Sequence, residues 1–498
     1  MDGRRTWIRL LGAAVVMMGA ALGASAQAPR DTVTLAMTLE PPGLDPTAGA
    51  ASAIAEIVHY NVLETLTKIG PDGRVSPLLA ERWTVSPDLK AWTFQLKKGV
   101  RFHNGEPFDS ATVKYAFERA VAQGSTNKDK ATFANIEAIS AQDPHTLVLL
   151  LKNPAPDLLF QLGQATASIV EPKSAATNAT QPVGTGPYRL QSWAKGSQIV
   201  LARWDGYRDA PRIKIRRAVF RFINDPAAQV ASLLSGDVDA FPRVAAGRSL
   251  EQFKADKRFQ VLVGGSRAKT ILALNNKKKP FDDVRVRRAI AAAVDRKAVI
   301  EGAADGFGVP IGSHYVPGAP GYVDTTGVNP HDPEKAKALL KEAGVSAPLE
   351  VSIKLPPTPY ARQGGEVIAA QLAKVGIQAK LENVEWALWL SGVYANKNYD
   401  MTIISHVEPL DFGNYAKPGY YWGYESPRFN ALWARINNTG NADERARLMG
   451  EAQKLIADDS PNVFLYQPQW ITVAKARLKG LWQDMPVFAN DLSALRWE

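Results

Sequence analysis

Apolar and polar residues alternate in several short runs along the chain, and these runs predict β-strands. The clearest run is 92–97, where Trp92, Phe94 and Leu96 alternate with polar side chains and would form one buried face. Asn104-Gly105 follows as a predicted tight turn. The other strand-like runs are 146–151, 349–353, 401–404 and 463–466.

Apolar residues at helical spacing, bounded by capping residues, predict amphipathic helices between these strands. Asp109 would cap a helix whose apolar stripe begins at Val113. Asp225-Pro226 and Asp332-Pro333 each place a capping carboxylate before a proline that suits the first helical turn. Further signals are terminating glycines at 236, 344 and 376 and a capping box formed by Asn441 and Glu444. Alternation of strands and helices favours an α/β fold.

The N-terminal segment predicts export from the cytoplasm. Arg4, Arg5 and Arg9 precede an apolar run over 10–22, and the small residues of Ala24-Ser25-Ala26 follow it. We expect a signal peptide over 1–26, cleaved after about Ala26. A membrane anchor is the alternative, but the apolar run is shorter than the roughly 20 residues that span a bilayer. The paired arginines also leave a twin-arginine route open beside an ordinary basic signal.

Composition limits the classes of protein that this chain can be. It has 498 residues and no cysteine, so disulfides, thiolate metal ligands and a lipidated cysteine after the signal are all excluded. The mature chain should therefore be free in the periplasm. A net charge of +10 could indicate binding to nucleic acid, but the charged residues are dispersed along the chain. The longest basic run, residues 277–279, is interpreted as a solvated turn, and no nucleic-acid partner is expected.

Catalytic and metal-binding motifs are hard to find. The six histidines show no metal-ligand spacing, and the sequence lacks the common zinc-protease, hydrolase and nucleotide-binding motifs. Gly184-Thr185-Gly186 is followed by Pro187, which has no amide donor, so a tight turn between domains is the better interpretation. Asp237 with Asp239 could resemble a glycosidase pair, but both directly follow a helix terminator. We expect neither a cofactor nor a resident metal.

Aromatic residues gather between 386 and 422 and give a better functional signal. Polar groups lie among them, and rings around a few placed polar groups are typical of a small-molecule cleft. The aromatic members are Trp386, Trp389, Tyr394, Tyr399, Phe412, Tyr415, Tyr420, Tyr421 and Trp422.

Six segments resemble, in order, a known family. The longest is LLAERWTVSPDLKAWTFQLKKGVRFHNGEPFDSATVKYAFERA over 78–120. The others are EPPGLDP from Glu40, PVGTGPYRL from Pro182, SLLSGDVDAF from Ser232, LALNNKKKPFDDVRVRRAIAAAVDRKAVI from Leu272 and HDPEKAKALLKEAG from His331. The chain is similar to the large solute-binding proteins (family 5) that feed peptide and nickel ABC importers.

The resemblance implies an α/β, two-lobed periplasmic binding protein fold of type II, the large cluster C type, with an extra domain inserted in the first lobe. Lobe one would comprise 27–70, 183–270 and 470–498. The inserted domain would be 71–182, and lobe two would be 271–469.

The resemblance also implies a ligand site, with one departure from the peptide-binding pattern. Peptide-binding relatives carry a Trp-x-Ala-Asp-Tyr motif whose Asp pairs with the peptide amine. Here the corresponding strand leads to His406 in place of that Trp and Pro409 in place of that Asp. Either Glu408 or Asp411 would take over the amine, or the ligand has no amine there. Residues 50–52, where some peptide binders carry a carboxylate, are small and uncharged.

Trp386 matches a cleft tryptophan of the family, and Arg362 is the candidate for an anionic ligand group because guanidinium binds carboxylate or phosphate in a bidentate manner. The expected ligand-binding residues are Trp386, Ser405, His406, Glu408, Asp411, Tyr415, Arg362 and Tyr420.

The expected function is binding without chemistry. The chain would be a monomer that captures a small solute between hinged lobes and delivers it to an inner-membrane ABC permease with its ATPase. Short peptides or related amino-acid-derived compounds are the expected ligands. Opines, sugar-derived compounds and metal chelates stay open, the last through His406, as do a chemosensory receptor, a periplasmic chaperone and a hydrolase.

Overall fold

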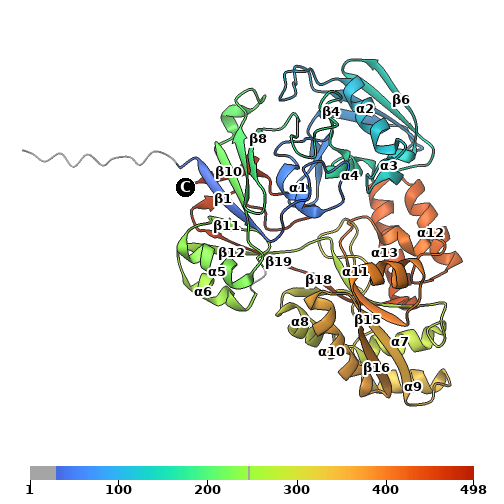
Figure 1. Ribbon diagram of the computed structural model, residues 1–498. Coiled ribbons are helices and arrows are strands. Elements are labelled where there is room, and N and C mark those ends of the chain that lie inside the picture. The colour runs from blue at the N-terminus through green and yellow to red at the C-terminus, as the bar shows by residue number, and fades with distance from the viewer. Residues whose placement is uncertain (1–29, 245–246) are drawn as a thin grey trace, which may run out of the picture. The chain divides into compact units, whose positions relative to one another are not determined.

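A computed structural model describes residues 30–244 and 247–498, so the expected signal peptide over 1–26 lies outside the described residues. Within this part of the chain no helix is both long and apolar enough to cross a membrane. Three sheets of four or more strands organise it (Figure 1).

The seven-stranded sheet takes its strands from three distant parts of the chain, in the order β12-β19-β11-β1-β10-β9-β8. Central β1 runs parallel to β10 over its whole length, whereas β19 is antiparallel to both β11 and β12. The bounds are β1 Thr32–Met37, β8 Tyr188–Ala194, β9 Gln198–Arg203, β10 Arg217–Phe222, β11 Ala240–Phe241, β12 Phe259–Gly264 and β19 Trp470–Lys475. Helices α1 Ser52–Val58, α5 Pro226–Ser235 and α6 Leu250–Ala255 accompany this sheet.

The six-stranded sheet has the order β14-β18-β13-β17-β15-β16. All six residues of β13 are buried because successive side chains enter two different cores. The strands are β13 Lys269–Leu274, β14 Gly308–Pro310, β15 Leu349–Leu355, β16 Ile377–Asn383, β17 Met401–His406 and β18 Asn462–Pro468. The helices are α7 Val284–Ala293, α8 Arg296–Ala304, α9 Pro333–Glu342, α10 Pro359–Ala373, α11 Trp386–Leu388, α12 Pro427–Asn438 and α13 Ala442–Asp459.

The four-stranded sheet, order β4-β5-β7-β6, is antiparallel throughout and has its own core. Its bounds are β4 Ala80–Val85, β5 Ala91–Leu96, β6 Ile136–Asp143 and β7 Thr146–Leu151, with helices α2 Ser110–Val121, α3 Lys130–Ala134 and α4 Leu158–Gln161. Two small ribbons pair β2 Thr67–Ile69 with β3 Val75–Pro77 and β20 Leu478–Lys479 with β21 Arg496–Trp497.

Most of the predicted elements are confirmed. Asp109 and Thr112 form a reciprocal capping box at α2, and Asp225 caps α5, which ends at left-handed Gly236. One detail was wrong: Asn441 caps α13 alone, because the carboxylate of Glu444 binds Arg447 instead of closing a box.

Gly184 and Gly186 need to be glycine because their backbone packs against that of Asn61 and Val62. A Cβ at Gly184 would lie 2.0 Å from the carbonyl oxygen of Val62, and one at Gly186 would lie 2.4 Å from that of Asn61. This close backbone approach explains the glycines of the GTG segment without a phosphate loop.

The chain passes from the seven-stranded to the six-stranded sheet between β12 and β13, and returns between β18 and β19. The first connection is residues 265–268 and the second is Gln469 alone. These two short connections lie next to a cavity of about 730 Å³.

Candidate functional site

A cavity of about 730 Å³ is lined by residues from the regions of the chain that form all three of the larger sheets. Its volume is within the range of small-molecule sites. The lining residues come from 46–59, 128, 164–166, 243, 267–268, 358–360, 386, 405–409, 468–470 and 485–488.

Aromatic rings form much of the apolar wall. Trp386, at the start of α11, is 41% exposed, so a large part of its indole is available to a ligand. Its ring meets Trp389 edge to face, with centroids 5.8 Å apart. Trp470 and Phe488 also line the cavity, and their rings stack with centroids 5.3 Å apart. Such rings favour a ligand with apolar or planar parts.

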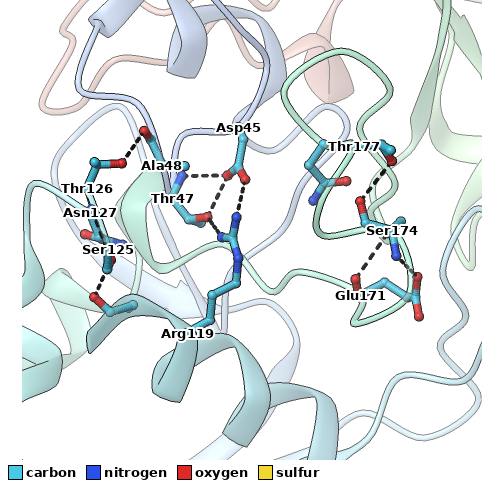
Figure 2. A network of polar contacts seen from close by, with 12 residues as sticks. Asp45, Thr47, Ala48, Arg119, Ser125, Thr126, Asn127, Glu171, Ser174 and Thr177 are labelled. Carbon is cyan, nitrogen blue, oxygen red and sulfur yellow. Dashed lines mark hydrogen bonds and ion pairs between the residues drawn. The ribbon is translucent and has the colours of Figure 1, made fainter. Parts of the chain in front are cut away.

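The loop before α1 forms another wall, and a polar network fixes it to α2 (Figure 2). The guanidinium of Arg119 donates to Asp45 at 2.9 Å and also bonds to the hydroxyl of Thr47. Thr126 donates to the carbonyl oxygen of Ala48 at 2.7 Å. The next residues of the loop, 49–52, line the cavity and carry no charge.

Asp411 lies in a buried network beneath the cavity wall. One carboxylate oxygen accepts from the ammonium of Lys269 at 2.5 Å, and the other lies 2.9 Å from Nε2 of His314 and 3.3 Å from Nδ1 of His406. Burial alone would raise the pKa of Asp411, but Lys269 and His314 hold it well below its usual range. Burial lowers the pKa of His314 to about 4, against the opposing charge of Asp411.

Three side chains of this network could in principle bind a metal ion. The ligand atoms of His314, His406 and Asp411 lie within 4.8 Å of one another, a donor set that suits a divalent ion. However, Lys269 already neutralises Asp411, and its ammonium would repel a second cation at this short distance. The residues present therefore fit an internal ion-pair network better than a metal.

Ser405 and Glu408 line the cavity, at and just after the end of β17. Glu408 is exposed, and its backbone carbonyl accepts from Lys269 at 2.6 Å, which fixes the main chain below the side chain. It is the only Asp or Glu among the described residues that line this cavity. A ligand amine could therefore meet a carboxylate here.

Five of the expected residues do not line the cavity: Asp411 in the network described above, and four others. His406 is buried, with Nε2 3.0 Å from the hydroxyl of Tyr421, and it does not line the cavity. Tyr415 is buried against Trp422, and its hydroxyl accepts a hydrogen bond from the side-chain amide of Asn462. Tyr420 packs on Trp422 at 4.4 Å. Arg362 is half-exposed and lies 3.6 Å from Glu385.

Two arginines on the cavity wall were missed by the sequence analysis. Arg243 has its guanidinium 5.2 Å from the ring centroids of both Trp470 and Phe488, and it pairs with buried Glu56. Arg267 lies in the 265–268 connection and is 8% exposed. Neither stands in a recognisable motif, because their positions depend on how the two sheets meet.

Comparison with known proteins agrees with this arrangement. Residues 74–454 match the model of a family described as bacterial extracellular solute-binding proteins, family 5 middle. The dipeptide-binding protein of Escherichia coli K12 is 29% identical over 520 residues, covering 94% of this chain and 95% of that protein. Heme-binding protein A of Haemophilus influenzae is 28% identical, covering 83% of this chain and 81% of that protein.

A solved structure extends the comparison. The PBP AgaA from A. tumefaciens R10, in complex with agropinic acid, is 27% identical to this chain and superimposes with a TM-score of 0.79. The match covers 94% of this chain and 99% of AgaA. The two-lobed periplasmic binding fold that was expected is confirmed by this similarity.

Proposed function

This chain belongs to the bacterial extracellular solute-binding proteins of family 5, and we propose that its solute is a short peptide or a related amino-acid-derived compound. The protein is a periplasmic solute-binding component of an ABC importer. The proposal also includes cleavage of a signal peptide after about Ala26 and release of the mature chain without a lipid anchor. The mature protein would be a monomer that docks on its permease.

The observation that carries the ligand class is the wall of the 730 Å³ cavity, which is lined both by Glu408, a solvent-exposed carboxylate, and by the apolar ring of Trp386. Glu408 would bind an amine, Ser405 would hydrogen-bond the ligand, and Trp386 would pack on its apolar part. Asp411 is not needed for this role because Lys269 neutralises it. The similarity to a dipeptide-binding protein supports the same class.

Hinge closure would couple binding to delivery. We assign 27–70, 183–270 and 470–498 to lobe one, 71–182 to the inserted domain and 271–469 to lobe two. The two connections at 265–268 and 469 would then act as the hinge. A ligand that contacts both lobes favours the closed state, which the permease and its ATPase would recognise.

A dedicated opine-like ligand is the second candidate, and it has an observation of its own. The cavity wall has no carboxylate at 50–52 and no Asp where peptide binders place their amine anchor, while AgaA binds agropinic acid. Such a wall would suit a ligand that the protein recognises by its acid groups rather than by a peptide backbone.

Native mass spectrometry of protein isolated gently from the periplasm separates the two candidates. A ladder of masses that matches mixed short peptides supports a peptide importer, and a single mass supports a dedicated ligand. Protein that stays empty, and binds none of a dipeptide or an opine panel in calorimetry, would contradict the proposed ligand class. Conversion of a bound compound into products would indicate a hydrolase instead.

A further inference from the structure

Arg267 occupies a special place in the fold. It lies in the 265–268 connection that joins the seven-stranded sheet to the six-stranded sheet. Its side chain lines both the 730 Å³ cavity and a neighbouring cavity of about 360 Å³. A charge at this position acts on the segment about which the two sheets would move.

The guanidinium of Arg267 lacks a counterion among the residues that the structure describes. Nη1 is buried and has no hydrogen-bond partner there. Asp484 contributes at longer range, but its Oδ1 accepts from the amide of Gly265 at 2.6 Å. Burial lowers the pKa of Arg267, and the fields of Tyr315 and Asp484 only partly oppose this effect. A buried cation without a paired anion is costly, which favours an anion that arrives from outside.

The other charges on the wall leave the same excess. Arg243 is paired with Glu56, and burial lowers the pKa of His59 to about 4, so this histidine is neutral. Lys128 is exposed and has no carboxylate partner in the described part of the chain. Among the described residues that line this cavity, Glu408 is the only carboxylate that could balance Arg267 and Lys128. The wall therefore offers places for two anionic groups and one cationic group.

We propose that Arg267 binds an anionic group of the ligand, and that the protein selects an acidic amino-acid derivative with one amine and two acid groups. The guanidinium would bind one carboxylate through paired N–H donors, Lys128 the other, and Glu408 the amine. This inference rests on the proposed amino-acid-derived class and narrows it. It also moves the anion-binding role from Arg362 to Arg267.

Calorimetry with two nearly isosteric dipeptides tests the inference. Ala-Glu carries one amine and two carboxylates, whereas Ala-Gln lacks the side-chain carboxylate. We expect wild-type protein to bind Ala-Glu at least about 10-fold more tightly than Ala-Gln. Arg267→Met should remove this preference, and Arg267→Lys should retain part of it. Equal binding of the two dipeptides by wild-type protein, with unchanged Ala-Glu affinity in Arg267→Met, overturns the inference and leaves the proposed function intact.

Two controls keep the result interpretable. Melting temperatures of the Arg267 variants show whether they fold, and Lys128→Met on the exposed rim tests the second anionic place if they do not. If wild-type protein binds neither dipeptide, the proposed peptide class fails. Glutarate, which carries two carboxylates and no amine, then tests the anion site. If glutarate raises the melting temperature of wild-type protein but not that of Arg267→Met or Lys128→Met, the inference is supported. If the three proteins respond equally to glutarate, the inference is overturned.

Discussion

The carboxylate of Asp411 accepts a hydrogen bond from the ammonium of Lys269 at 2.5 Å, and both side chains are more than nine-tenths buried. This pair joins the first residue of β13 to the segment that follows β17. The same Lys269 ammonium donates to the backbone carbonyl of Glu408 at 2.6 Å. A buried ion pair therefore fixes the main chain that presents Glu408 to the cavity.

Asp411→Asn should destabilise the fold rather than remove a ligand contact directly. The substitution leaves the Lys269 ammonium buried without a counterion, and the loss of one partner of a buried pair typically costs about 3–5 kcal/mol. Urea unfolding at pH 7.5 measures this loss. Glu408→Gln is the matched control, since an exposed carboxylate should contribute little to stability but should weaken binding of an amine. If Asp411→Asn retained wild-type stability and lost only affinity, the structural role of the pair would be refuted.

Trp386→Ala should weaken ligand binding by about 10-fold, or 1.4 kcal/mol, without unfolding the protein. Trp386 is 41% exposed on the cavity wall, so removal of its indole takes away ligand contact and little core packing. Calorimetry with the compound identified by native mass spectrometry measures the change. Leu388→Ala is the control because Leu388 is 64% exposed on the same short helix and does not line the cavity. Unchanged affinity in Trp386→Ala would remove this residue from the site.

The fold was largely predictable because its signals are local. Asp225 before Pro226 and a left-handed Gly236 define α5 at both ends, and period-two alternation defines β5. Family resemblance then supplied the two-lobed arrangement. Asn441 with Glu444 shows the limit of local reasoning, because a nearby arginine on the same helix competes for the glutamate.

The site was less predictable because charge pairing between distant residues decides which groups face the ligand. Glu408 and Asp411 stand three positions apart in the sequence and appear equivalent. Lys269, 142 residues away from Asp411, distinguishes them by neutralising one. Arg267 could not be singled out by any local pattern, since the absence of a counterion among the described residues is a property of the folded chain.

Arg445→Met should shift the protein toward a more open state. Arg445 of α13 donates to Asp157, at the start of α4, at 2.5 Å, and this ion pair links two parts of the chain that belong to different sheets. Small-angle scattering should show a larger radius of gyration for the ligand-free variant, and apparent ligand affinity should fall by a few-fold. Arg447→Met is the control, because Arg447 pairs with Glu444 and Glu451 of its own helix. Equal scattering and affinity in the two variants would contradict this role.

The buried, neutral ring of His103 should make the stability of the protein fall in mild acid, where the unfolded chain binds a proton at this histidine more readily. Its Nδ1 accepts from the amide of Gly184 at 3.3 Å and its Nε2 lies 2.9 Å from the carbonyl oxygen of Gly186, so the neutral ring satisfies both contacts. Burial lowers the pKa of His103 to about 4, below the value of about 6.5 in the unfolded chain. Between these values the unfolded state binds more protons, so stability is full above about pH 6.5 and falls as pH falls toward 4.

The expected loss from this one histidine is about 2 kcal/mol between pH 7.5 and pH 5.0. Urea unfolding of wild-type protein at the two pH values measures the total slope, to which His59 also contributes because burial lowers its pKa to about 4. His103→Gln should be less stable than wild-type protein at pH 7.5 but should lose less on acidification. His331→Gln, at an exposed histidine, should keep the wild-type slope. An unchanged slope in His103→Gln would show that protonation of His103 does not limit stability in acid.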